Sequence, residues 1–218
     1  MIHLERYRAL IEELKPYNAS LLAVSKTKPS GDILELQKYG QKIFGENYVQ
    51  ELIQKAAEVK DAEWHFIGHL QTNKVKQLLP VANVIQGVDS LKLLHEINKQ
   101  SSALNKIQNC LLQIFIAKEE TKFGFSPDEI AKIYNENLLA ELKSIRILGF
   151  MGMATNTDDE ALVRDEFRQL RKLYNQFSEG KFNTLSMGMT SDYKIALEEG
   201  STMIRIGSAI FGERDYSK

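Results

Sequence analysis

Two lysines, Lys26 and Lys28, follow directly on the apolar run LLAVS at residues 21–25. If this run is a strand, alternation puts Leu22, Val24 and Lys26 on one face, with the lysine at its end. Desolvation there would lower an amine pKa that starts at about 10.4, leaving a neutral amine that can attack a carbonyl. A salt-bridge partner or a snorkelling surface lysine fits the same position, so three roles stay open. Lys28 is expected to be a solvated charge or one that steers anions.

Small residues follow two later apolar runs, in SMGMTSDY and in RIGSAIFG. Backbone amides at small residues can approach an anion closely, and hydroxyls can donate to it. Glycine after a strand is usually only a turn residue, but two such stretches together indicate a phosphate-bearing ligand. The candidate residues are Ser186, Gly188, Gly207 and Ser208.

Other polar residues near the ends of apolar runs leave alternatives open. Arg205 has the same parity as Gly207, so it should be buried and needs a partner, either a carboxylate such as Glu46 or a ligand atom. Asn47 could reach a ligand or cap the helix expected after it. The four histidines have no metal-ligand spacing, and no Ser-His-Asp order or carboxylate pair is visible. We therefore predict no metal site and no catalytic residue.

Eight short runs rich in Val, Ile, Leu and Phe must position these residues, and each is followed by a longer amphipathic segment. This rhythm is typical of parallel strands covered by helices. Proposed helix starts are the capping boxes Ser126 with Glu129 and Thr157 with Glu160, and residues 1–14 predict an N-terminal helix. The predicted strands are residues 20–26, 42–47, 63–68, 83–89, 110–117, 145–153, 183–188 and 202–207.

Eight strand–helix units without a linker predict one α/β domain over residues 1–218, folded as a (β/α)₈ TIM-type barrel. An open doubly wound sheet is the alternative. No strand is followed by a G-x-G-x-x-G turn, and eight strands are many for an open sheet of this size. A barrel requires the functional site at the carboxyl ends of its strands, with phosphate most often held after strands seven and eight.

Composition excludes several functional classes. The 218 residues are 43% hydrophobic and 26% charged, with Lys+Arg 28 against Asp+Glu 29, so no global field attracts nucleic acid. No apolar stretch approaches the roughly 20 residues that span a bilayer. The one cysteine, Cys110, lies in an apolar run and suits a buried thiol in a reducing compartment. We expect a cytoplasmic protein that contacts neither nucleic acid nor membrane.

Several blocks together resemble the pyridoxal phosphate homeostasis protein family, which is related to the N-terminal barrel of alanine racemase. They are AVSKTKP, FGENYVQE, WHFIGHLQTNK, LGFMGM, SMGM with SDY, and GSTMIRIGSAIFGERDYSK, in order from residue 22 to the end. The resemblance implies an alanine racemase-like barrel that binds pyridoxal 5′-phosphate (PLP). It also implies that Lys26 forms the internal aldimine, a Schiff base with this vitamin B6 cofactor.

The same resemblance implies roles for the other candidates. Arg205 would face the pyridine nitrogen, and Asn47 and Met151 would lie beside the ring. The sequence departs from the family at Ser208, where many members have Thr, and at Thr190, where many have Ser, but both keep a hydroxyl. The implied phosphate-holding residues are Ser186, Gly188, Gly207 and Ser208.

An arginine at the ring nitrogen bears on function, because PLP enzymes that form carbanions mostly use an acidic partner there to make the ring an electron sink. Arginine stays cationic and donates to an unprotonated nitrogen, which weakens the sink. The second, β-rich domain that gives alanine racemase its tyrosine base is not expected in this chain. The resemblance thus predicts a PLP homeostasis protein that holds its cofactor without efficient turnover.

Two other functions stay open at this point. One is a PLP-dependent amino acid racemase or lyase, and the other is a cofactor-free Schiff-base aldolase in which Lys26 attacks a sugar phosphate. For the carrier, the expected partners are PLP and PLP-dependent apoenzymes, and the expected oligomeric state is a monomer.

Overall fold

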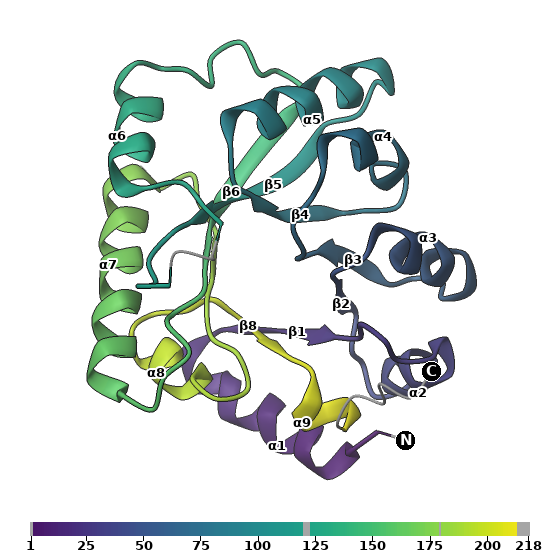
Figure 1. The fold of residues 1–218 in the computed structure, drawn as a ribbon. Helices are drawn as coiled ribbons and strands as arrows, with labels where there is room; N and C mark the ends of the chain where they lie inside the picture. The colour runs from purple at the N-terminus through teal and green to yellow at the C-terminus, as the bar shows by residue number, and fades with distance from the viewer. Residues whose placement is uncertain (1, 120–122, 179, 213–218) are drawn as a thin grey trace.

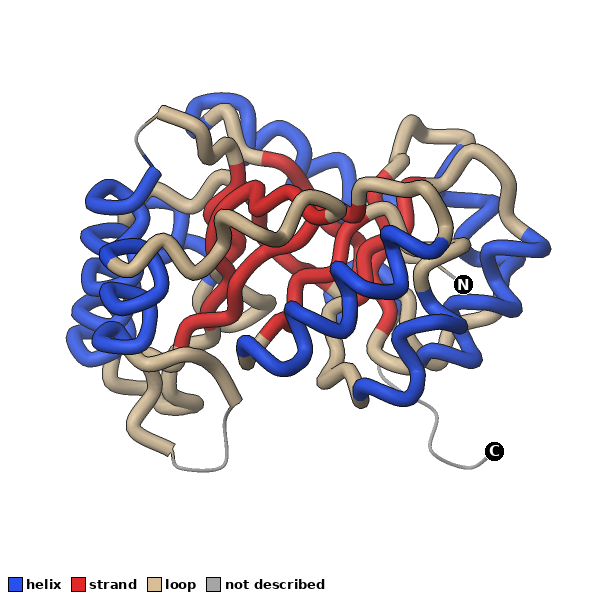
Figure 2. The backbone as a smooth tube through the Cα atoms, turned by 90° about the horizontal axis from the view of Figure 1, so that it is seen from above, coloured by secondary structure: helices blue, strands red, loops and turns tan. Residues whose placement is uncertain are grey.

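Eight parallel strands close into a barrel in the computed structural model, which describes residues 2–119, 123–178 and 180–212. Each strand pairs with the next along the chain, and β8 pairs with β1 to complete the ring. Helices surround the sheet on its outer side (Figure 1). The view turned by 90° shows the strands in red enclosed by helices in blue (Figure 2). The closed barrel confirms the predicted fold class and excludes the open sheet.

All eight predicted strands are present, and each ends one to three residues earlier than predicted. They are β1 (Ser20–Val24), β2 (Ile43–Glu46), β3 (Glu63–Phe66), β4 (Val84–Val88), β5 (Gln108–Ile114), β6 (Ile145–Gly152), β7 (Thr184–Ser186) and β8 (Met203–Ile206).

The helices lie between successive strands, with one before the first strand and a short one after the last. They are α1 (Leu4–Leu14), α2 (Ser30–Gln37), α3 (Val49–Glu58), α4 (Val75–Leu78), α5 (Leu91–Ala103), α6 (Pro127–Asn135), α7 (Glu160–Ser178), α8 (Tyr193–Glu198) and α9 (Ser208–Phe211), with single 3₁₀ turns η1 (Lys15–Tyr17) and η2 (Thr72–Lys74). Helix α1 contacts α9, and the His3 N–H donates to the Ile210 carbonyl at 2.7 Å, so the first and last helices close the outer layer together.

The two predicted capping boxes have different outcomes. Ser126 caps α6 as predicted, and the Glu129 side chain accepts from the Ser126 N–H at 2.8 Å. The prediction for Thr157 is wrong, because α7 starts only at Glu160 and the Asp159 carboxylate accepts from the N–H groups of residues 161 and 162, each at 3.1 Å. The Thr157 hydroxyl instead accepts from the Asp159 N–H at 3.2 Å. An acidic side chain next to the helix is the better-placed acceptor.

The hydrophobic core has two layers. Most buried apolar side chains fill the space between the sheet and the helices, including Phe44, Phe150 and Phe167. Inside the barrel, a much smaller apolar cluster contains Val84, Leu111 and Met151. Polar side chains occupy much of the remaining interior. The barrel interior therefore holds buried polar groups beside a small apolar cluster.

The pairing between neighbouring strands is uneven around the barrel. Strands β5 and β6 are in register at seven positions, whereas β7 and β8 are in register only at Ser186 with Met203. Strand β7 has three residues, and two backbone hydrogen bonds join the chain after it to β8, from the Met187 N–H to the Met203 carbonyl at 3.2 Å and from the Arg205 N–H to the Gly188 carbonyl at 2.9 Å. The seam between β7 and β8 is thus the least paired part of the sheet.

Candidate functional site

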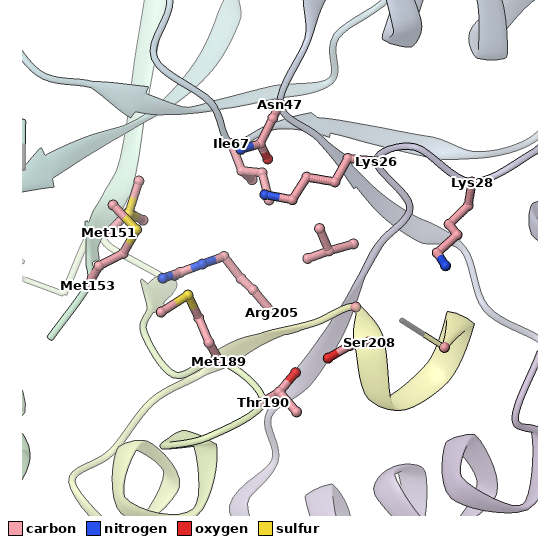
Figure 3. Close-up of a pocket in the computed structure, with 13 residues that line it drawn as sticks. Lys26, Lys28, Asn47, Ile67, Met151, Met153, Met189, Thr190, Arg205 and Ser208 are labelled. Carbon is pink, nitrogen blue, oxygen red and sulfur yellow. The ribbon is translucent and has the colours of Figure 1, made fainter. Parts of the chain in front are cut away.

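A cavity of 180 Å³ opens at the carboxyl ends of the strands, where the barrel fold predicted the site. Its lining comes from segments far apart in the sequence, which the closure of the barrel brings together (Figure 3). The lining residues are Val24, Lys26, Lys28, Asn47, Ile67, Met151, Met153, Met189, Thr190, Arg205, Gly207, Ser208 and Gly212.

Lys26 lies in a tight turn that directly follows β1. The Lys28 N–H donates to the Ser25 carbonyl at 3.0 Å, which closes a four-residue turn with Lys26 in its second position. Thr27 has φ of 64°, a left-handed conformation that is costly for a β-branched residue and has to be held by its surroundings. The Lys26 side chain extends from this turn into the cavity (Figure 3), as the strand alternation predicted.

A buried ion cluster of Lys55, Glu46 and Glu51 supports this turn from behind. The Lys55 ammonium donates to the Ser25 carbonyl at 2.7 Å, to Glu46 Oε1 at 2.8 Å and to Glu51 Oε1 at 2.7 Å. Ser25 Oγ donates to Glu46 at 2.6 Å, and the Thr27 N–H donates to Glu51 at 2.5 Å. The residues on both sides of Lys26 are therefore fixed by one cluster, which the sequence analysis did not predict.

Glu46 is not the partner of Arg205, which corrects one of the two alternatives predicted from the sequence. Its side chain is fully buried on the helix side of the sheet, where it contacts Lys55 and Ser25. Burial raises the pKa of Glu46 to about 7, although Lys55 and Ser25 act in the opposite direction. Glu46 Oε2 has no hydrogen-bond partner among the described residues. This carboxyl group is thus costly to ionise and depends on Lys55.

Arg205 is buried in the barrel, 5% exposed, with its guanidinium held by neutral acceptors. Its Nη1 donates to the carbonyl and to the hydroxyl of Ser186, both at 2.8 Å, and its Nη2 donates to the Gly152 carbonyl at 2.9 Å. Burial lowers the pKa of Arg205 to about 10, and the charge of Asp192 opposes this shift. The group therefore remains a cation at neutral pH, and it lines the cavity (Figure 3).

Ser186 and Gly188, which were predicted to hold a phosphate, do not line the cavity. Ser186, the last residue of β7, is fully buried in the barrel, where its hydroxyl accepts from Arg205. Gly188 has φ of 98°, and a Cβ there would lie 2.6 Å from Ala196 Cβ. The other predicted phosphate residues, Gly207 and Ser208, do line it. Their role toward a phosphate stays a prediction.

Asn47 lines the cavity, and the cap that was its alternative role is not formed. Helix α3 has Tyr48 at its N-cap position and no side-chain cap. Asn47 Oδ1 is buried without a hydrogen-bond partner among the described residues, an arrangement that calls for a donor from a ligand or water. Gly68 permits this position, because a Cβ at residue 68 would lie 2.2 Å from the Asn47 carbonyl oxygen.

Several lining residues were not proposed as site residues from the sequence, among them Met153, Met189 and Thr190. Thr190 was noted only as a departure from the family pattern, yet its hydroxyl lies on the same side of the cavity as that of Ser208 (Figure 3). The sequence does contain a signal for two of them, because Met189 and Thr190 directly follow the small residues of the stretch SMG. Lys28, expected to be solvated or to steer anions, lines the cavity and is half-buried.

The histidines have no part in the cavity lining. His65 is buried inside the barrel, and the His69 Nδ1 lies 2.8 Å from the Asp89 carboxylate at the ends of β3 and β4. Within the described residues, no group of three or more His, Cys, Asp or Glu side chains could hold a metal ion. No helix among the described segments is long and apolar enough to cross a bilayer.

The chemistry of the cavity is that of a site for an anion with a carbonyl group. Three cationic side chains, Lys26, Lys28 and Arg205, contribute to its lining, and no carboxylate does so among the residues described. The hydroxyls of Thr190 and Ser208 add donors. A lysine in such a place can bond covalently to an aldehyde. The fold and the site together define a (β/α)₈ barrel with a cation-rich, hydroxyl-bearing cavity at its mouth, suited to an anion.

The comparisons with known proteins give this class a family. The model of the alanine racemase N-terminal domain matches residues 3–215. The pyridoxal phosphate homeostasis protein of Aquifex aeolicus is 40% identical over 204 residues, which cover 91% of this chain and 88% of that protein. This chain belongs to the pyridoxal phosphate homeostasis protein family, within the group that shares the alanine racemase N-terminal domain.

Solved structures agree with this assignment. PipY of Synechococcus elongatus PCC7942, solved with PLP bound, is 32% identical, with a TM-score of 0.86 over 95% of this chain and 99% of that one. Alanine racemase of Clostridium difficile 630 is 16% identical, with a TM-score of 0.76 over 98% of this chain and 59% of the enzyme. The second likeness concerns the fold alone.

Proposed function

We propose that this chain binds PLP in the cavity at the mouth of the barrel and acts in PLP homeostasis. The observation that carries the proposal is a lysine side chain in a cavity whose lining includes two further cations and no carboxylate among the described residues. PLP carries an aldehyde, an anionic phosphate and a pyridine nitrogen, and each finds a matching group here. The names of the relatives and the PLP in the PipY structure support the same cofactor.

The residues divide into three roles. Lys26 bonds to the aldehyde, and its turn is fixed by Lys55. Gly207, Ser208 and Thr190 receive the phosphate at the start of α9, whose first N–H groups have no acceptor within the helix. Arg205 donates to the ring nitrogen.

The remaining predicted residues act around these groups. Asn47 and Met151 lie beside the ring. Ser186 acts through Arg205, because its hydroxyl and carbonyl both accept from that guanidinium. Gly188 allows close packing of the chain that leads from β7 to Thr190.

We further propose that the protein holds PLP without efficient turnover. Bound PLP supplies an electron sink for carbanion chemistry, strongest when its ring nitrogen is protonated. Arg205 is held as a cation and can only donate to that nitrogen, so it opposes such protonation. The lining contains no histidine, tyrosine or carboxylate among the described residues, so Lys28 is the one side chain there, apart from Lys26, that is suited to transfer a proton. The racemase or lyase alternative lacks a specific observation in its favour.

Borohydride trapping tests the cofactor site. Protein incubated with PLP is reduced, digested and mapped by mass spectrometry, and we expect the pyridoxyl group on Lys26. Lys26→Ala should lose both the visible absorbance and the label, whereas the neighbouring Lys28→Ala should keep the label on Lys26 and bind PLP more weakly. Absence of a label on Lys26 in the unsubstituted protein would overturn the assignment.

The non-catalytic role is tested separately. When the protein is incubated with alanine or other amino acids in D₂O, we expect no exchange of the Cα proton for deuterium at enzymatic rates of about 1 s⁻¹. Exchange at such rates would establish an enzyme instead. A monomeric state, a cytoplasmic location and transfer of PLP to apoenzymes belong to the same proposal. Light scattering tests the monomeric state. Reactivation of a PLP-dependent apoenzyme by the loaded protein tests the transfer of PLP.

A further inference from the structure

A chain of hydrogen bonds runs through the barrel interior from the cavity to the opposite end of the sheet. Its four links measure 2.8, 2.8, 2.8 and 3.0 Å, so all are short enough to be hydrogen bonds. Its members are, in order, Arg205 Nη1, Ser186 Oγ, Gln86 Oε1 and Nε2, His65 Nδ1 and Nε2, and Glu63 Oε1.

The orientation of the Gln86 amide fixes the direction of every link. Gln86 Nε2 lies 3.3 Å from the Met203 sulfur, which can only accept, and Gln86 Oε1 lies 2.8 Å from Ser186 Oγ. If the amide were rotated by a half-turn, Gln86 Nε2 would face Ser186 Oγ, which already accepts a hydrogen bond from Arg205. With Nε2 facing His65, the imidazole Nδ1 accepts and its Nε2–H donates. All donors therefore point from the cavity toward the far end of the barrel.

The two ends of the chain carry opposite charges. Arg205 is buried, and no carboxylate is in salt-bridge contact with it among the described residues. Glu63, the first residue of β3, is 47% exposed, and the hydrogen bond from His65 holds its pKa below the usual range. The four links and the two side chains that they cross limit the distance between the charged ends to at most roughly 16 Å. Hydrogen bonds aligned in one direction polarise one another, which strengthens each of them.

We propose that Glu63 and His65 are positioning residues for Arg205, and that the hydrogen-bonded chain couples the Glu63 carboxylate to the ring-nitrogen side of the cofactor site. This inference deepens the proposed function and depends on it. The coupling stabilises the Arg205 cation from the far end of the barrel and fixes the acceptor that Ser186 presents to it. A surface carboxylate remote from the cavity would then influence the proton affinity of the bound cofactor.

Glu63→Gln tests the coupling, because the amide oxygen still accepts from His65 while the charge is lost. Purified protein loaded with PLP is titrated by absorbance against pH. Direct Coulomb action between unit charges roughly 16 Å apart, screened as in water, changes the proton dissociation constant of the bound cofactor less than about two-fold, so coupling through the chain predicts a rise of more than two-fold. Asp61→Asn is the matched control, because it removes an exposed charge two residues away, and asparagine tolerates the φ of 59° there. An equal shift of the proton dissociation constant in both variants would show that any surface charge at this end of the barrel has the same effect, and would contradict a coupling specific to Glu63.

A double-mutant cycle separates the chain from direct action through space. In Ser186→Ala, where the chain is cut, the added Glu63→Gln substitution should change the proton dissociation constant less than two-fold. An undiminished effect in that background would overturn the proposal.

A cofactor-free measurement keeps the two proposals apart. Imidazole ¹⁵N NMR of the unliganded protein should show His65 protonated at Nε2 and bare at Nδ1, with the Nε2–H resonance moving in Glu63→Gln. A proton on Nδ1 would reverse the direction of the links and refute the inference whether or not PLP binds. If PLP fails to bind while the His65 result holds, the proposed function fails and the chain stands as a property of the barrel.

Discussion

Lys55→Met is the perturbation that most directly tests how the Lys26 turn is held. Methionine keeps the length and apolar character of the lysine stem, so the substitution removes the charge and the three donated hydrogen bonds with little change in volume. It leaves Glu46 fully buried without its cationic partner. Removing one member of a buried ion pair typically costs about 3–5 kcal/mol.

The pH dependence of this cost follows from Glu46. Its pKa is already raised to about 7 with Lys55 present, and losing the cation raises it further. At pH 8 the variant must either bury an unpaired carboxylate or take up a proton, so we expect a loss of about 3 kcal/mol in the free energy of unfolding. At pH 5.5 the carboxyl group is protonated in both proteins, and the loss should fall by at least half.

Urea unfolding at pH 8 and pH 5.5, followed by the fluorescence of Trp64, measures both values. Lys38→Met is the control, because Lys38 pairs with Glu35 at 2.8 Å on the surface and should contribute nothing measurable. Equal effects of the two substitutions at pH 8 would refute the buried-ion reasoning. A loss that does not change between the two pH values would refute the part assigned to Glu46.

Three further predictions concern the barrel and its helices. The folded-state pKa of Glu46 lies above its unfolded value, so the contribution of this carboxyl group to stability is present below about pH 4.5 and is lost as pH rises through about 7. The stability of Glu46→Gln, measured against pH, should lack this decline. Asp159→Ala should cost about 1 kcal/mol in thermal unfolding, and Thr157→Ala clearly less, since Asp159 caps α7; a larger loss for Thr157 would restore the original prediction. Gly188→Ala should cost more than about 2 kcal/mol, whereas Gly31→Ala, in open space within α2, should be neutral or stabilising; equal stabilities would contradict the packing at residue 188.

The fold was largely predictable because parallel strands buried on both faces appear as apolar runs in the sequence. The same alternation along β1 predicted that Lys26 reaches the mouth of the barrel, and the structure confirms it. The family resemblance added the cofactor, which no pattern of spacing contains. These predictions succeed because each rests on a local property of one strand.

The predictions that failed depend on where strands end and on which face of the sheet a residue lies. Counting Ser186 among the residues at the end of the seventh strand placed it at the mouth, whereas its side chain is buried inside the barrel, where it accepts from Arg205. Lys55 resembles a solvated helix residue in sequence, and only the packing of α3 on the sheet buries it beside Glu46. Such contacts between distant segments have no signal in a single sequence.

The weakly paired seam between β7 and β8 has a consequence for ligand binding. Residues on both sides of this seam line the cavity, with Thr190 following β7 and Ser208 following β8. Local opening of a fold starts where cooperative contacts are fewest, and a ligand that binds only the closed form lowers the population of open states. An anion held by both sides would therefore act as a non-covalent staple across the seam, joining β7 and the strands before it to β8, which already pairs with β1.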